Sequence, residues 1–424
     1  MTAVRAAVRA DVRAEVSADA EWRARAERAV AAAASTGSKR PHALYGPGAP
    51  GDAPLHYVRA HGCQVVTADG RTLVDCTMAL GAVALGYAAA DVTAAVQEAA
   101  AAGPVAGLTH VSEPALAERL CALVPCAERA LFLKSGAEAV AAAVRLARAA
   151  TGRDQVVGSG YFGWLDWWST GPGVPAGASA DFTPVPFGDA AALERAVDAA
   201  GPDLAAIVVE PVVEREPPAG YLARARALAD RAGAVLVFDE VKTGFRLHAG
   251  GYQAVCGVTP DVATFGKAMA NGYPLAAVVG CAGVMDAARR AWISSTLASE
   301  ATALAAAHAV LDRHAREDVG AELARTGARL RAAVGDALGA SGAPGVHVDG
   351  LDPMFFVRFA DHAGVPGEVR ETAFLTAARE AGVLFKRGAY DYAALAHDDA
   401  AVDAVARAAS AGFAAVRATD AEGA

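Results

Sequence analysis

The chain has 424 residues, of which 54% are hydrophobic and 20% charged, and this balance excludes an intrinsically disordered protein. Its formal net charge of −9 gives no electrostatic reason to expect binding to nucleic acid or to anionic lipid. The six cysteines show neither metal-ligand spacing nor a dense disulfide framework, so we expect a reducing compartment, the cytoplasm.

Two uncharged stretches are too interrupted to predict a membrane span. The stretch 76–90 is short and contains two glycines, and the stretch 268–285 is broken early by a glycine and a proline. At the N-terminus, arginines alternate with acidic residues among alanines, so we expect no secretory signal.

The first 75 residues predict a helix, a loop and a hairpin. Residues 1–36 are typical of a helix that ends at Gly37, either packed on the protein or free as a partner-binding arm. The Pro- and Gly-rich residues 41–54 predict a loop. Apolar runs on both sides of an Asp-Gly pair predict a hairpin over 61–75.

From about residue 90 to residue 310 the pattern alternates between helix and strand. It predicts a helix at 91–100, then a strand, a turn and a long helix over 130–153, stopped at Gly152. Further helix and strand signals, the strands rich in valine, lie at 154–160, 205–211, 222–233 and 234–241. Strand–helix–strand units of this length favour a parallel sheet covered by helices, an α/β fold. The remainder predicts helices and a strand at 354–359, in a second α+β lobe.

Two segments, 46–51 and 158–163, match the dinucleotide pattern G-x-G-x-x-G. The first is proline-rich and has no strand before it. The second follows a strand, but the next residues, WLDWWSTGPGVP, cannot form the helix that would receive a pyrophosphate. A nicotinamide-dependent oxidoreductase therefore stays a minor alternative.

Three other features carry chemistry. Residues 134–138, Lys-Ser-Gly-Ala-Glu, begin a long helix after a strand and are either an anion site or an ordinary helix cap. Asp239 ends a buried strand, where it meets a ligand cation or pairs with an arginine such as Arg246. Lys267 lies in the apolar stretch 260–274 and is either solvent-seeking or chemically used.

A pyridoxal phosphate enzyme needs these three parts: an amine for the Schiff base, a carboxylate for the ring nitrogen and an anion site for the phosphate. From about Val65 onward the sequence resembles the class III aminotransferases of fold type I, including glutamate-1-semialdehyde aminomutase and the amino-sugar aminotransferases of secondary metabolism. The motifs that carry the resemblance are FDEVKTGFR (238–246) and PDVATFGKAMANGYPLAAVVG (260–280).

The resemblance implies an architecture in three parts. A large PLP-binding domain at 70–310 would hold a mostly parallel seven-stranded sheet, and a small α+β domain would occupy 311–424. An N-terminal segment at 1–69 would pack with the small domain.

The resemblance also implies roles for individual residues. Lys267 matches the lysine that forms the internal aldimine and then moves the proton, Asp239 the partner of the pyridine nitrogen, and Glu210 a carboxylate near the reacting imine. The cofactor-binding positions are matched by Ser135, Gly136 and Ala137 at the phosphate, by Val241 and Tyr161 at the ring, and by Thr296. Thr296 resembles a threonine lent to the neighbouring subunit's phosphate, which implies a homodimer with shared active sites. The alternative is that the hydroxyls of 294–296 only cap the helix that follows.

The sequence departs from the family at positions that bear on the substrate. Ala137 stands where the family usually has Ser or Thr, and Phe162 replaces a His. The segment 46–59 lacks the arginine with which the aminomutase holds its substrate, since only His56 or Arg59 falls nearby, and this argues against that enzyme.

The aromatic run Trp164, Trp167 and Trp168 either lines a pocket for a sugar or apolar substrate or packs its own loop. The resemblance therefore predicts a homodimeric, cytoplasmic, PLP-dependent aminotransferase without a metal, with a role in specialised metabolism and an amino sugar or related small molecule as its substrate. An aminomutase, racemase or decarboxylase of the same family is the alternative, since these enzymes share the cofactor groups. A non-catalytic protein of the same fold is disfavoured by the intact Lys267.

Overall fold

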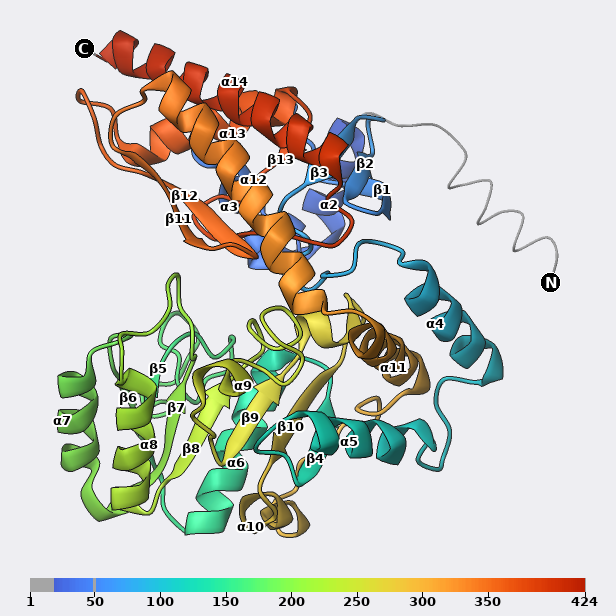
Figure 1. The fold of residues 1–424 in the computed structure, drawn as a ribbon, viewed down its shortest axis with the longest axis vertical. Helices are drawn as coiled ribbons and strands as arrows, with labels where there is room; N and C mark the ends of the chain where they lie inside the picture. The colour runs from blue at the N-terminus through green and yellow to red at the C-terminus, as the bar shows by residue number, and fades with distance from the viewer. Residues whose placement is uncertain (1–18, 49–50, 424) are drawn as a thin grey trace. The chain divides into compact units, whose positions relative to one another are not determined.

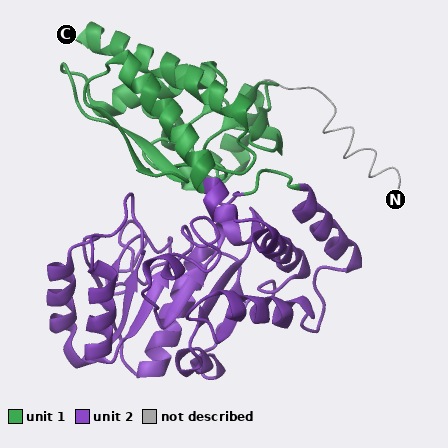
Figure 2. Ribbon diagram, in the orientation of Figure 1, with its two compact units in different colours: residues 1–80, 85–89, 324–424 green, residues 81–84, 90–323 purple. Residues whose placement is uncertain are grey.

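The computed structural model describes residues 19–48 and 51–423 and divides into two compact units (Figure 2). Unit 2 consists of residues 81–84 and 90–323, and unit 1 consists of the described residues of 1–80, 85–89 and 324–424. The domain boundaries expected from the sequence, after residues 69 and 310, remain a prediction.

Unit 2 is built on a seven-stranded sheet with the order β4-β10-β9-β8-β7-β5-β6 (Figure 1). Its strands are β4 (Arg129–Leu133), β5 (Gln155–Ser159), β6 (Phe182–Pro184), β7 (Leu204–Val209), β8 (Val235–Asp239), β9 (Val262–Phe265) and β10 (Ala276–Gly280). Strand β10 is antiparallel to both of its neighbours, whereas β9, β8, β7, β5 and β6 run parallel to one another. The mostly parallel seven-stranded sheet expected from the resemblance is confirmed.

Helices cover the sheet because its central strands are apolar on both faces. Every residue of β7 and β8 is buried, which is typical of parallel strands enclosed between helices. Helix α6 (Gly136–Thr151) packs on β4 and on β7 to β10, and α8 (Tyr221–Ala232) packs on β7 and β8. The other helices of unit 2 are α4 (Ala90–Ala102), α5 (Ser112–Leu123), α7 (Ala190–Ala200), α9 (Gln253–Cys256), α10 (Ala282–Met285) and α11 (Ala301–Arg316), with short 3-10 turns η3 (Gly201–Asp203), η4 (Lys267–Ala270) and η5 (Asp286–Arg289).

Unit 1 contains two small sheets. One has the order β1 (Tyr57–His61), β2 (Gln64–Thr67), β3 (Thr72–Asp75) and β13 (Val383–Leu384); the other has the order β11 (Val346–Leu351), β12 (Met354–Phe359) and β14 (Asp391–Tyr392). The α-helices are α2 (Asp19–Ala29), α3 (Pro41–Tyr45), α12 (Val319–Ser341), which belongs to unit 1 from residue 324 onward, α13 (Gly367–Glu380) and α14 (Asp399–Gly423). The hairpin predicted at 61–75 and the strand predicted at 354–359 are confirmed.

The two ends of the chain share the core of unit 1. Strand β13 pairs in parallel with β3, so a C-terminal strand extends the sheet of the N-terminal hairpin. Cys76 from the N-terminal part and Phe374, Val405 and Phe413 from the C-terminal part belong to one buried cluster.

Two predictions for the N-terminal part were wrong. The helix expected over 1–36 ends at Ala29 instead of Gly37, because residues 32 and 33 have φ of +55° and +61°, which an α-helix does not allow. Residues 1–18 lie outside the described part of the chain. The loop expected over 41–54 begins with the short helix α3, which has a proline in its first turn and a buried tyrosine at its end. The Tyr45 hydroxyl donates to the Pro54 carbonyl at 2.5 Å. Residues 49–50 also lie outside the described part.

Within the described residues, no helix combines the length and the apolar character that crossing a membrane requires.

Candidate active site

The candidate site lies at the carboxyl edge of the large sheet. Strand β4 is antiparallel to β10, which is antiparallel to β9, so β4 points in the same direction as the parallel strands. The residues that follow β4, β5, β7 and β9 include Ser135, Tyr161, Glu210 and Lys267, and Asp239 is the last residue of β8. Because the carboxyl ends of parallel strands form the usual ligand edge of an α/β sheet, these five residues come together there.

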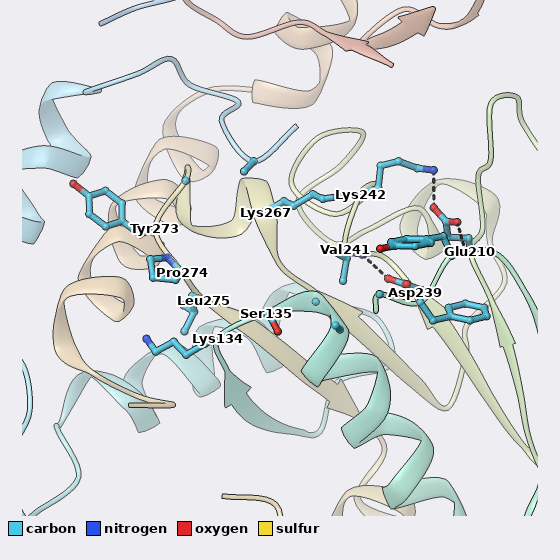
Figure 3. Close-up of a pocket in the computed structure, with 17 residues that line it drawn as sticks. Lys134, Ser135, Glu210, Asp239, Val241, Lys242, Lys267, Tyr273, Pro274 and Leu275 are labelled. Atoms are coloured by element: carbon cyan, nitrogen blue, oxygen red, sulfur yellow. Dashed lines mark hydrogen bonds and ion pairs between the residues drawn. The ribbon is translucent and has the colours of Figure 1, made fainter. Parts of the chain in front are cut away.

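A cavity of about 320 Å³ at this edge brings together eight of the nine predicted site residues (Figure 3). The predicted residues that line it are Ser135, Gly136, Ala137, Tyr161, Glu210, Asp239, Val241 and Lys267. Lys134, Lys242 and the segment 272–275 complete much of the wall.

Thr296 is the exception, because it does not line this cavity and lies exposed in a turn before α11. The interpretation of residues 294–296 as the start of a helix was wrong. Helix α11 begins at Ala301, and its cap is Glu300, whose carboxylate accepts hydrogen bonds from the backbone N–H groups at 302 and 303. The role of Thr296 towards a partner subunit stays a prediction.

The N-terminus of α6 forms one end of the cavity. The Ser135 hydroxyl accepts a hydrogen bond from the Glu138 N–H, and the Glu138 carboxylate accepts one from the Ser135 N–H at 2.8 Å, which makes a complete capping box. This arrangement fixes the start of the helix and leaves the N–H groups of Gly136 and Ala137 as its first donors, without a capping bond among the described residues. A side-chain carbon on Gly136 would lie 2.8 Å from Val241 Cγ1, so only glycine lets the helix start approach Val241 this closely. The N–H groups of Gly136 and Ala137 can therefore hold an anion against the cavity.

Asp239 is a buried carboxylate with a fixed orientation. Its Oδ1 accepts hydrogen bonds from the Val241 N–H at 3.0 Å and from the Thr264 hydroxyl at 3.2 Å. Both bonds engage the same oxygen, which leaves Oδ2 for a donor in the cavity. Burial, and secondly the nearby Glu210 carboxylate, raise the pKa of Asp239 to about 7. A cation bound against Asp239 would relieve this penalty.

The alternative that Asp239 serves only as a partner for Arg246 finds no support in these contacts. Arg246 is fully buried, and its Nη2 donates to the carbonyls of Gly81 and Val83 at 3.2 and 3.3 Å.

Lys267 has a strained backbone and an unusual electrostatic environment. It begins the turn η4, directly after β9, with a φ of +47°, which a residue with a side chain rarely adopts. Burial, and secondly the Lys242 cation, lower the pKa of Lys267, whereas Glu210 and Asp239 act in the opposite direction. Such a lysine is suited to act as a nucleophile or base near neutral pH.

Sequence reasoning did not assign a role to Lys242. Its ammonium lies 2.6 Å from Glu210 Oε1, and both side chains are about nine-tenths buried (Figure 3). Glu210 Oε2 accepts a hydrogen bond from the Tyr161 N–H at 3.0 Å. The sequence did offer one sign of such a role. Lys242 follows the Asp-Glu-Val sequence at the end of a buried strand, and a charged side chain in such a place needs a partner.

The aromatic run packs its own loop. Phe162 is buried and stacks on Trp167 with ring centroids 5.8 Å apart, and Trp168 meets Phe162 edge to face at 5.5 Å. Trp164 is 74% exposed. The loop-packing interpretation is confirmed for Trp167 and Trp168, and none of the three tryptophans lines the cavity.

The segment after β5 lacks what a dinucleotide site requires. Residues 160–181 form loop and turns, so no helix N-terminus follows the GSGYFG sequence at 158–163. Among the described residues, no group of three His, Cys, Asp or Glu side chains is arranged to hold a metal ion.

Comparison with known proteins identifies the family of the chain. The family model "Aminotransferase class-III" matches residues 47–163 and 187–394. A 3-aminobutyryl-CoA aminotransferase of Cloacimonas acidaminovorans (strain Evry) is 32% identical over 360 residues, covering 82% of this chain and 86% of the relative. A 2'-deamino-2'-hydroxyneamine transaminase of Streptomyces kanamyceticus is 39% identical over 314 residues, covering 73% of this chain and 79% of the relative.

Among solved structures, the PLP internal aldimine form of the FumI protein of Sphingopyxis sp. MTA144 superimposes with a TM-score of 0.88 at 27% identity. The superposition covers 95% of this chain and 97% of that chain. The expected fold-type I architecture and the expected class of enzyme, a pyridoxal phosphate-dependent transaminase, are thereby confirmed. The chain belongs to the class-III aminotransferase family.

Proposed function

We propose that the cavity at the carboxyl edge of the sheet holds pyridoxal phosphate and catalyses transamination of a small-molecule donor and acceptor. The observation that carries this proposal is the convergence of three parts from distant segments of the chain. A primary amine from Lys267, a buried carboxylate from Asp239 and the helix N-terminus at Ser135 line one cavity. No one of these features is specific alone, but together they match the amine, ring-nitrogen and phosphate requirements of the cofactor.

The residues of the cavity fit the cofactor. The hydroxyl of Ser135 and the N–H groups of Gly136 and Ala137 would hold the phosphate, and Val241 and Tyr161 would contact the ring. Oδ2 of Asp239 would accept a hydrogen bond from the protonated pyridine nitrogen. When bound, pyridoxal phosphate supplies an aldehyde that reacts with amines and a cationic ring that withdraws electrons from the substrate carbon.

Lys267 and Asp239 would then act directly on the reaction. Lys267 would bind the cofactor through its amine, give way to the donor amine and, once free, move a proton at the substrate α-carbon. Its lowered pKa favours the uncharged amine that can accept this proton. Asp239 would remain ionised and hold the ring nitrogen protonated, and the ring cation would offset the burial that raises its pKa. Glu210 would be a third charged group beside the reacting atoms.

We propose an amino sugar or a related small molecule of specialised metabolism as the substrate. Support comes from the 39% identity to the 2'-deamino-2'-hydroxyneamine transaminase. Tryptophan side chains do not give the cavity its selectivity for a substrate, because Trp167 and Trp168 pack against Phe162. Discrimination among carbonyl acceptors would depend on polar residues at the cavity wall.

A homodimer is part of the proposal. Five of the exposed large apolar side chains of unit 2 lie in the two segments 105–111 and 292–297, among them Leu108 at 87% and Trp292 at 85%. The others are Val105, Val111 and Leu297. The Ala301 N–H donates to the Pro104 carbonyl at 2.8 Å, so the segment with Leu108 joins the segment that precedes α11. An exposed apolar surface of this kind is typical of a face covered by another chain, and we propose a second copy. The exposed Thr296 between Trp292 and α11 would reach the partner subunit's phosphate.

We also propose the cytoplasm as the compartment. All six cysteines are unpaired, and burial raises the pKa of Cys63 to about 11 and of Cys126 to about 12, which keeps these thiols protonated. A chain with six free thiols is suited to a reducing environment.

Spectroscopy of the purified chain with added pyridoxal phosphate tests the function. We expect a visible absorbance band that is lost when a productive amine donor is added, with pyridoxamine phosphate and the keto product found by mass spectrometry. Subsequent addition of a keto sugar should regenerate the band. If no donor from a panel of amino acids, amino sugars and simple amines converts the cofactor, transamination is contradicted. Rearrangement of one substrate without a keto product identifies an aminomutase instead.

A further inference from the structure

One charged pair with both members in the wall of the cavity has no role in the proposed reaction. Lys267 and Asp239 have assigned roles, whereas the Lys242 ammonium lies 2.6 Å from Glu210 Oε1 in the same cavity. The two side chains are only 9% and 11% exposed. Burying an ion pair is costly, and its net contribution to stability is small or unfavourable. Its place beside the reactive amine therefore calls for a functional explanation.

Both oxygens of Glu210 are engaged by groups other than Lys267. Lys242 occupies Oε1, and the Tyr161 N–H donates to Oε2 at 3.0 Å. The backbone at Gly160 closes over this carboxylate, since a side-chain carbon there would lie 2.8 Å from Glu210 Cβ. Glu210 is thus held in one orientation from two sides.

We propose that Lys242 is a positioning residue that keeps Glu210 as its own counter-ion, so that Lys267 stays an uncharged amine able to react with the cofactor. The inference rests on the proposed function, because it assigns the chemistry to Lys267. When Lys267 reacts, its nitrogen lone pair adds to the aldehyde carbon, the nitrogen loses its protons and the aldehyde oxygen leaves as water. An ammonium has no lone pair and cannot begin this step.

The charges that face Lys267 give the direction of the effect. Besides burial, the groups that act on it are Lys242, Glu210, Asp239 and Arg246. Without Lys242, the Glu210 carboxylate would remain buried beside Lys267 with no cationic partner of its own and would stabilise the ammonium form. When both members of the pair are removed, no uncompensated carboxylate remains beside Lys267. Its balance between amine and ammonium then returns towards that of the wild type. The pair therefore behaves as a unit, and removing one member is more disruptive than removing both.

The state of Lys267 can be measured in the cofactor-free protein without any turnover. Brief exposure to acetic anhydride over a series of pH values modifies uncharged amines, and peptide mass spectrometry reports the modified fraction at Lys267. Exposed Lys39 in unit 1 provides an internal reference for reagent decay. The variants are Lys242→Met, Lys242→Arg and the double variant Lys242→Met/Glu210→Gln.

We expect Lys242→Met to raise the pH midpoint of Lys267 modification by at least about one unit, a roughly tenfold loss of reactivity below the midpoint. Lys242→Arg and the double variant should stay close to the wild type. An unchanged midpoint in Lys242→Met, or a double variant shifted as far as the single one, overturns the proposal. If Lys242→Met does not fold, Glu210→Gln alone decides: it should lower the midpoint, because the Glu210 charge that opposes the effect of the Lys242 cation on Lys267 is then gone. No change in the midpoint overturns the proposal.

A second measurement separates this inference from the proposed function. Uptake of pyridoxal phosphate, followed by absorbance, should slow in Lys242→Met by the same factor as acetylation. If the wild type does not take up the cofactor at Lys267, the proposed function fails although the acetylation midpoint can still be compared. If the wild type takes it up and the Lys242→Met midpoint does not move, the inference alone fails.

Discussion

Gly163 lies directly against Ala137, and a side-chain carbon on Gly163 would come within 2.3 Å of Ala137 Cβ. The loop after β5 therefore meets the first turn of α6 with no space for a side chain between them. Gly163 also has a φ of +89°, which disfavours any other residue. Ala137, the position where this family usually has a hydroxyl group, is thus covered by Gly163.

Gly163→Ala should weaken cofactor binding, because the new methyl group must displace the helix start that holds the phosphate. We expect at least a tenfold increase in the Kd for pyridoxal phosphate, about 1.4 kcal/mol. Gly173→Ala is the matched control, since Gly173 has a φ of +87° and no atom within 4 Å of an added carbon. The control should lose about 1 kcal/mol of stability and keep its cofactor affinity. Equal affinity loss in both variants would show that backbone strain, not contact with Ala137, is responsible.

Asp239→Asn should retain cofactor binding but lose several orders of magnitude in rate. An amide does not hold a proton on the pyridine nitrogen as a carboxylate does, so the ring withdraws electrons less strongly. Single-turnover conversion of the bound cofactor by an amine donor measures this step. A near-normal rate would mean that Asp239 only orders the Val241 backbone and the Thr264 side chain.

The cofactor-free protein should show the cost of burying Asp239 in its pH dependence. The pKa of Asp239 is about 7 in the folded chain against 3.8 for an ordinary aspartate. Between these values the folded chain binds more protons than the unfolded chain, so this group makes the free energy of unfolding fall as the pH rises. Urea unfolding of the wild type and of Asp239→Asn from pH 5 to pH 8 should therefore diverge, on the order of a few kcal/mol, with the wild type losing more. Parallel pH profiles would contradict the raised pKa.

The sheet and the central residues of the site could be predicted because their signals are local. Valine-rich runs of strand length, such as 205–211 and 234–241, predict buried strands without any knowledge of the rest of the chain. The strands β7 and β8 that form there are buried at every residue. Asp239 and Lys267 are charged side chains in apolar stretches of sequence. A charge in such a place is costly unless it is used, and it therefore indicates function.

The Lys242–Glu210 pair could not be predicted, because it depends on the register between two strands. Val209 of β7 lies opposite Phe238 of β8, and this register brings Glu210 beside the end of β8 and within reach of Lys242. The sequence contains both residues but not the register. In the same way, the run Ser294 to Thr296 has the composition of a helix cap, yet α11 starts after Glu300, whose carboxylate caps it.

Mixing two defective variants at limiting cofactor tests whether active sites are shared between subunits. If Thr296 contacts the partner subunit's phosphate, Thr296→Val should lose about tenfold in cofactor affinity, so activity is measured at limiting cofactor. In a heterodimer with Lys267→Ala, one site carries both defects and the other carries neither. Mixing under subunit exchange should therefore restore up to about one quarter of wild-type activity. No recovery, with heterodimers verified by native mass spectrometry, rules out the contact between subunits.

The most direct measurement is reduction of the purified protein and pyridoxal phosphate with borohydride, followed by peptide mapping. Reduction makes the link between cofactor and lysine permanent, and we expect the modified peptide to contain Lys267, with Lys267→Ala folded, unlabelled and inactive. The two competing amines in the cavity, Lys134 and Lys242, provide internal controls. Label on Lys267 alone supports the assignment of the cofactor-binding lysine; label on Lys134 or Lys242 would contradict it.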